Sequence, residues 1–176
     1  MLDSPIIRRF LAYIVDVVLL FFILAPLGFI IQIAGEINIV DNKALYLTLL
    51  LNFTLPVLFY FVISDYVFKG ITIGKRLFNL QAFSKSGGSI PIQSAFLRNI
   101  IKLLPWELVH LSLFLFMPAT GGIGGWNFAG LGLAYLLIFV YSGFVWRTEG
   151  KQSIHDFVAQ TMVTNQVAEV EKTTPA

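Results

Sequence analysis

The sequence predicts an all-α integral membrane protein with about four transmembrane helices, a short amphipathic cytoplasmic helix and a small cytoplasmic β-hairpin. Of its 176 residues, 57% are hydrophobic and only 12% are charged, which is about half the charged share of a soluble domain. A globular fold of this size buries only about two-thirds of its surface, so much of this apolar material would face water. A lipid bilayer removes that difficulty. The basic residues also gather on one side of the apolar runs.

Four apolar runs approach the length of about 20 helical residues that crosses a bilayer. They cover residues 10–34, 44–64, 103–118 and 128–146. The first run contains one charge, Asp16, and the second and fourth contain none. The third is short and contains Glu107 and His110, so it either spans the bilayer from Pro105 onward or forms a re-entrant segment.

The placement of lysine and arginine predicts the orientation. Basic residues precede the first run, follow the fourth, and fill the segment between the second and third (Lys69, Lys75, Arg76, Lys85, Arg98 and Lys102). Only Lys43 lies on the other side of the runs. Because cytoplasmic segments are rich in these residues, both termini are predicted to be cytoplasmic.

Alternating side chains in the cytoplasmic segment predict a small β-layer. Residues 77–83 and 90–92 read as two strands of a hairpin around a turn at Gly87 and Gly88. Residues 161–167 are expected to add a further strand to this layer.

Residues 93–102 have apolar and basic side chains on separate faces, which suits a helix lying in the membrane interface before the third run. Residues 1–167 are predicted to form a single transmembrane domain. Residues 168–176 are polar and are expected to be a disordered tail.

Asp16 is the most informative charge, because it lies about 9 Å inside the first run at 1.5 Å per residue. An ionised carboxylate there needs a partner or water. A cation from another element, Arg98 or Lys102, or Arg9 reaching along the helix, is the expected partner. Such a pair would either fix helix packing or take part in ion or proton movement.

Glu107 and His110 are three residues apart and therefore share one helix face. They suggest a proton relay or a cation site, with an interfacial carboxylate and a buried, satisfied imidazole as the alternative. A di-metal site would need a second Glu-x-x-His copy, and the sequence has none. The sequence also shows no cofactor motif, no base–nucleophile pair and no set of metal ligands, so no metal site, cofactor or enzymatic activity is predicted.

Other charges have simpler interpretations. The glycine spacing of residues 70–76 does not match a phosphate loop, and Asp65, Lys69 and Lys75 are interpreted as charges at the membrane boundary. Asp156 lies three residues after Ser153, the spacing of a capping box at a helix start. Near-neutral charge gives no support for nucleic-acid binding.

Four motifs, taken in order, resemble those of the RDD family of bacterial membrane proteins, named for one arginine and two aspartates. RFLAYIVD at 9–16 is similar to the opening motif, GITIGKRL at 70–77 to the Gly-x-Thr-x-Gly-Lys stretch, FLRN at 96–99 to the later arginine helix, and QSIHDFVAQT at 152–161 to the closing motif. The resemblance makes Arg9 the family arginine, Asp16 and Asp156 its aspartates, and Arg98 the later arginine. It also implies a bacterial inner membrane.

Two functions are expected from these residues. The first is cation or proton-coupled transport, a sodium–proton antiport link being implied for some family members, with Asp16, Glu107 and His110 as the ion or proton site. The alternative is a small adaptor that binds and regulates another membrane protein, with purely structural charges. Besides the lipid bilayer, the expected partners are a second copy or another membrane protein. The charged groups expected to converge into one cluster are Arg9, Asp16, Arg98, Glu107 and Asp156.

Overall fold

The computed structural model describes residues 4–36, 39, 41–116 and 124–165. Its first helix is α1, Pro5–Ala34, and one continuous helical run follows, made of α2 Asn42–Leu49, the π-helical turn η1 Leu50–Thr54 and α3 Leu55–Tyr66. After α4 Ile73–Leu77 and β1 Leu80–Ser84, a second continuous run joins α5 Ile92–His110 to the π-helical turn η2 Leu111–Leu115. The last elements are α6 Gly125–Arg147, α7 Ile154–Val158 and β2 Thr161–Asn165.

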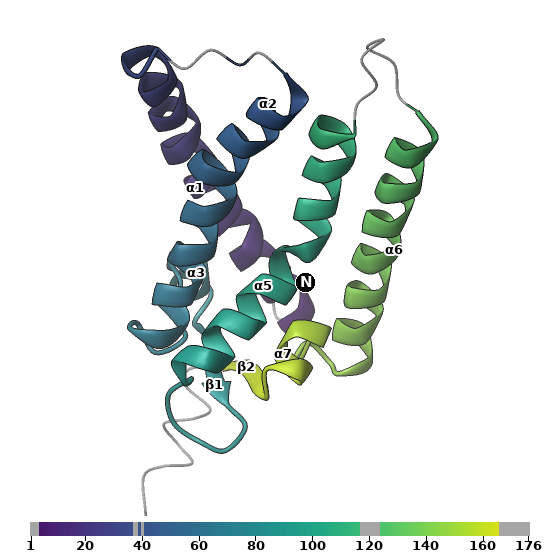
Figure 1. The fold of residues 1–176 in the computed structure, drawn as a ribbon. Helices are drawn as coiled ribbons and strands as arrows, with labels where there is room; N and C mark the ends of the chain where they lie inside the picture. The colour runs from purple at the N-terminus through teal and green to yellow at the C-terminus, as the bar shows by residue number, and fades with distance from the viewer. Residues whose placement is uncertain (1–3, 37–38, 40, 117–123, 166–176) are drawn as a thin grey trace, which may run out of the picture.

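The upper part of α1 and the whole of α6 lie on opposite sides of the helical array, with α5 between them (Figure 1). β1, β2 and α7 gather at one end of the array, which we call the sheet end (Figure 1). The first turns of α1 reach the sheet end, because Arg9 of α1 binds Asp156 of α7.

Three helices among the described residues are long and apolar enough to cross a membrane: Pro5–Ala34, Asn42–Tyr66 and Gly125–Arg147. They coincide with the first, second and fourth predicted runs, so a mostly helical fold with span-length apolar helices is confirmed. The third predicted run lies in the α5–η2 helix, whose first half carries Arg98, Asn99 and Lys102. Four crossings therefore stay a prediction.

The small sheet is confirmed, but the predicted hairpin is wrong. β1 pairs antiparallel with β2, from Leu80 opposite Asn165 to Ser84 opposite Thr161. The predicted turn exists, with positive φ at both glycines. Residues 90–92 nevertheless form no strand, because Pro91 cannot donate a ladder hydrogen bond and instead precedes α5 as its N-cap. The predicted strand at 161–167 is confirmed over Thr161–Asn165, and the predicted tail at 168–176 lies outside the described residues.

The predicted interfacial helix at 93–102 is not a separate element, since α5 continues through Pro105 to His110. A proline inside a helix leaves the carbonyl four residues earlier without its usual donor. Here that carbonyl belongs to Ile101, and the Tyr141 hydroxyl of α6 donates to it over 2.8 Å. A side chain from the neighbouring helix thus allows α5 to pass through the proline.

Two hydrophobic clusters hold α1, α3 and α5 together. One lies beside the sheet and includes Ala12, Val62, Ala82 and Ile90. The other lies farther along the helices and consists of Leu20, Leu24, Val57, Phe61 and Leu103. This packing fixes the helix faces that carry the buried charges.

Candidate functional site

Asp156 is the centre of a buried charged network at the sheet end. It is fully buried, and its carboxylate accepts hydrogen bonds from Arg9 of α1 and, over 2.8 Å, from the Nε of Arg98 of α5. The backbone N–H of Ser153 donates to it over 2.8 Å, completing the predicted capping box. One carboxylate therefore joins α1, α5 and α7.

Asp65 extends the network to α3 and α4. Its carboxylate lies 2.7 Å from Nη1 of Arg98, 3.1 Å from Nζ of Lys75 and 2.8 Å from Nδ2 of Asn99. Arg98 thus bridges two buried carboxylates. The interpretation of Asp65 and Lys75 as charges at the membrane boundary stays a prediction, and the structure adds that the two side chains form an ion pair. Asp65 directly follows the uncharged apolar run 44–64.

Asp16 does not join this network. Its carboxylate accepts from the Tyr60 hydroxyl (2.8 Å), the Thr72 hydroxyl (2.6 Å) and the backbone N–H of Gly74 (2.8 Å). The expected cation is absent from its hydrogen-bond partners among the described residues. Neutral donors stabilise a carboxylate well when several converge on it, and here they come from α3, from the N-cap of α4 and from α4 itself.

Lys102, one of the cations expected at Asp16, has an aromatic environment instead. Its Nζ lies 3.2 Å from the centroid of the Phe61 ring and 5.0 Å from that of the Tyr13 ring. It forms no hydrogen bond or ion pair within the part of the chain that the structure describes.

Glu107 and His110 form a second, separate polar group. Glu107 accepts from the Tyr46 hydroxyl (2.5 Å) and the Thr54 hydroxyl (3.0 Å), and Nδ1 of His110 lies 3.7 Å from Oε2 of Glu107. The structure therefore brings together Arg9, Arg98 and Asp156 as expected. The single cluster is wrong for Asp16 and Glu107, because each binds hydroxyl groups of the α2–η1–α3 run.

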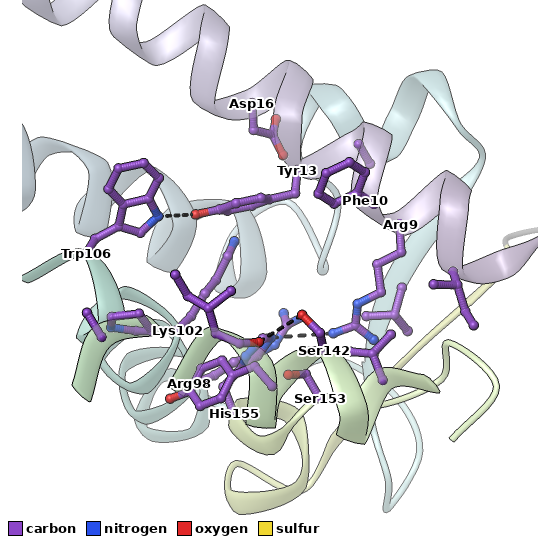
Figure 2. A pocket seen from close by; sticks show the side chains of 18 of the residues that line it. Arg9, Phe10, Tyr13, Asp16, Arg98, Lys102, Trp106, Ser142, Ser153 and His155 are labelled. Carbon is purple, nitrogen blue, oxygen red and sulfur yellow. Dashed lines mark hydrogen bonds between the residues drawn. The ribbon is translucent and has the colours of Figure 1, made fainter. Parts of the chain in front are cut away.

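A cavity of about 810 Å³ opens between α1, α5 and α6. Figure 2 shows Arg98 and His155 at its base, with Tyr13 and Trp106 across from them. Trp106 of α5 donates a hydrogen bond of 2.6 Å to the Tyr13 hydroxyl of α1. Most of the remaining lining is apolar, including Leu113, Leu131, Ala134 and Ile138.

Electrostatics at the sheet end differ between Asp156 and His155. Burial by itself would raise the pKa of the Asp156 carboxyl, but Arg9 and Arg98 outweigh it and hold that pKa well below its usual range. Burial lowers the pKa of His155 to about 3 despite the nearby Asp156. His155 is therefore neutral at physiological pH in the folded protein.

This burial predicts an acid sensitivity. The unfolded chain protonates His155 near pH 6.5, whereas the folded protein does so only near pH 3. Stability contributed by His155 is therefore full above about pH 6.5 and is lost as the pH falls, by up to about 1.4 kcal/mol per pH unit. Denaturation in detergent at pH 7.5 and 5.5 measures the loss. A His155→Gln variant should show a shallower dependence between these values, and an unchanged one would contradict the assignment.

The RDD family model matches residues 4–160. The chain belongs to the RDD family. The matched region of this RDD protein runs from the start of α1 to the end of α7 and contains every residue of the charged network. Searches of curated proteins and of solved structures gave no match.

Proposed function

We propose that this RDD protein moves protons or cations across a bacterial inner membrane, with Glu107 and His110 as the groups that bind and release the proton. The proposal assigns no catalytic reaction and no cofactor to the chain. Asp16, which the sequence suggested for the same role, is assigned a structural one, since neutral donors already occupy both its oxygens.

The observation that carries the proposal is a half-buried carboxylate–imidazole pair in the predicted third span. The side chains of Glu107 and His110 keep 20% and 15% of their exposure. The Thr54 hydroxyl lies 3.0 Å from Glu107 and 3.5 Å from Nδ1 of His110, so it touches both groups. Ionisable residues within membrane segments often mark proton pathways.

The helix geometry around this pair adds support. η1 ends at Thr54, and η2 begins directly after His110. Short π-helical turns inside α-helices are frequent at functional sites. The paired charges of Arg9, Arg98 and Asp156, in contrast, have the properties of a scaffold.

Transport assays in proteoliposomes would test the proposal. Under an imposed sodium, potassium or pH gradient, the wild type should show proton flux reported by an internal pH-sensitive dye. Glu107→Gln should lose this flux while remaining folded, because the amide cannot take up a proton. Glu149→Gln is the matched control, since Glu149 is 84% exposed at the end of α6, and its flux should equal that of the wild type. Undiminished flux in Glu107→Gln would overturn the role of this carboxylate.

We also propose four crossings with both termini in the cytoplasm. β1, which follows α3, pairs with β2, which follows α6, and Arg9 at the start of α1 binds Asp156 of α7. These contacts favour one side of the membrane for all four elements. An even number of crossings then requires the α5–η2 helix to be the fourth.

Because the chain has no cysteine, single cysteines can test this topology with a membrane-impermeant maleimide. In intact cells Lys43→Cys should react, whereas Ser86→Cys and Glu149→Cys should react only after permeabilisation. Labelling of Glu149→Cys from outside would mean an odd number of crossings, and labelling of Ser86→Cys would reverse the orientation.

The adaptor function remains the second candidate, and the surface of α6 favours it. Of this helix only Asn127 and Ala134 are buried, while Phe139 and Trp146 are 75% and 78% exposed. A second copy or another membrane protein would find a long apolar face there. Wild-type protein without flux under any gradient, together with a specific partner in crosslinked membranes, would favour this alternative.

A further inference from the structure

The cavity between α1, α5 and α6, which we call the lateral groove, opens toward the surface that the bilayer would cover. Three of its lining residues, Phe10, Tyr135 and Ile138, keep 61%, 61% and 46% of their exposure. Its volume of about 810 Å³ lies within the range of about 300–1,000 Å³ typical of ligand sites. An amphiphile in the bilayer therefore has lateral access to it.

The groove has a cationic wall. The charged residues that line it are Arg9, Lys75, Arg98, Lys102 and Asp16. Together with Asp65 and Asp156 of the network, the group holds four basic side chains and three carboxylates, so one basic side chain more than there are carboxylates. An anion in the groove would supply the missing counter-charge and so stabilise the protonated form of the fourth basic group.

Among the described residues, Lys102 is the basic group of this wall that has no hydrogen-bonded or ionic partner. The carboxylates of Asp65 and Asp156 form ion pairs with Arg9, Lys75 and Arg98. Within the part of the chain that the structure describes, Lys102 lies against the faces of Phe61 and Tyr13, which stabilise a cation less than a desolvated anion would. Trp106 and Tyr13, whose hydrogen bond lies beside it (Figure 2), are residue types that prefer the headgroup boundary.

The apolar part of the groove has the length of one leaflet. The lining on α6 runs from Val145 to Leu131, and its part beyond Tyr141, which lies at the level of Ile101 of α5, is ten residues long. Ten residues of helix rise about 15 Å, and half of a hydrocarbon core is also about 15 Å thick. A headgroup at Lys102 would therefore leave one acyl chain along α6.

We propose that the lateral groove binds one anionic phospholipid, with its phosphate at Lys102 and an acyl chain between α5 and α6. Basic pockets between transmembrane helices recognise anionic headgroups in this way. The groove does not include the Glu107–His110 pair, so the lipid-binding proposal can be tested independently of the transport proposal.

The test measures lipid retained by the full-length protein in mild detergent, by native mass spectrometry against equimolar phosphatidylglycerol and phosphatidylcholine. The wild type should retain one phosphatidylglycerol with a preference of about fivefold, the change expected for one lysine near a headgroup. Lys102→Gln should bring this preference close to one, and Lys102→Arg should keep it.

Two α6 variants separate the acyl site from the bulk lipid shell. Ile138 lines the groove and Val140 does not, although both are 46% exposed. Ile138→Trp should lower retention of both lipids, and Val140→Trp should leave it unchanged. The difference in lipid retention between these two variants tests the proposal even if Lys102→Gln fails to fold.

Three results would overturn the proposal. The first is a wild-type lipid preference in Lys102→Gln, and the second is equal lipid retention in the two tryptophan variants. The third is a wild-type protein that retains no more lipid than Ile138→Trp does. Glycerol phosphate added alone should not displace the lipid. Displacement at equal concentration would mean a site for free phosphate instead of a lipid.

Discussion

Replacing Arg98 by methionine is expected to destabilise the protein by about 3–5 kcal/mol, the cost of removing one partner from a buried ion pair. Arg98 lies 2.7 Å from Asp65 and 2.8 Å from Asp156, and all three side chains are buried. The substitution keeps most of the side-chain volume but leaves both carboxylates short of a cation. Thermal and chemical denaturation in detergent would measure the loss, and Arg76→Met, at an exposed position, is the matched control.

A second substitution shows whether stranded charge is the cause. Adding Asp65→Asn to Arg98→Met leaves Asp156 with Arg9 and leaves Lys75, whose pKa burial already lowers, able to release its proton. The double variant should therefore be more stable than the sum of the two single losses implies. Additive losses, or an Arg98→Met protein as stable as Arg76→Met, would contradict the role of Arg98 as a bridge.

The sequence was informative about the charged network because its partners are rare residues in an apolar chain. Arg9, Arg98 and Asp156 could be selected one by one, since a buried charge must find an opposite charge. The sequence could not show which of these charges form pairs. Asp65 and Arg98 are 33 residues apart, and only the packing of α3 against α5 brings them together. Asp16 was mispaired for a related reason: its partners Tyr60 and Thr72 are neutral residues of common types.

The secondary structure shows the same limit. The sequence predicted strands at 77–83 and 161–167 in one layer, but it paired the first with residues 90–92 instead of with β2, since the direct pairing depends on where the chain returns after α6. Pro105 suggested a helix start, whereas the Tyr141 hydroxyl from another helix lets α5 continue. In both cases a contact distant in sequence overrides a correct local signal.

Replacing Gly74 by alanine is expected to cost about 3 kcal/mol or more, although the change adds one methyl group. A Cβ at this position would lie 2.0 Å from the carbonyl oxygen of Ala12 and 3.0 Å from Cγ of Asp16. Both atoms belong to α1, so α4 would have to move away from that helix. Overpacking costs about 1–3 kcal/mol, and the movement would also weaken the 2.8 Å bond from the Gly74 N–H to Asp16, a bond to a charged group worth about 1.5–3 kcal/mol.

Gly143→Ala is the matched control, because nothing lies within 4 Å of the added atom and alanine is favoured over glycine in a helix. That variant should be at least as stable as the wild type in detergent. A cycle with Asp16→Asn then separates the two contributions to the Gly74 loss. If the bond to Asp16 contributes, Gly74→Ala should cost less in the Asp16→Asn background than in the wild type. Equal costs would assign the whole effect to the contact with Ala12, and a Gly74→Ala protein of wild-type stability would contradict the close approach of α4 to α1.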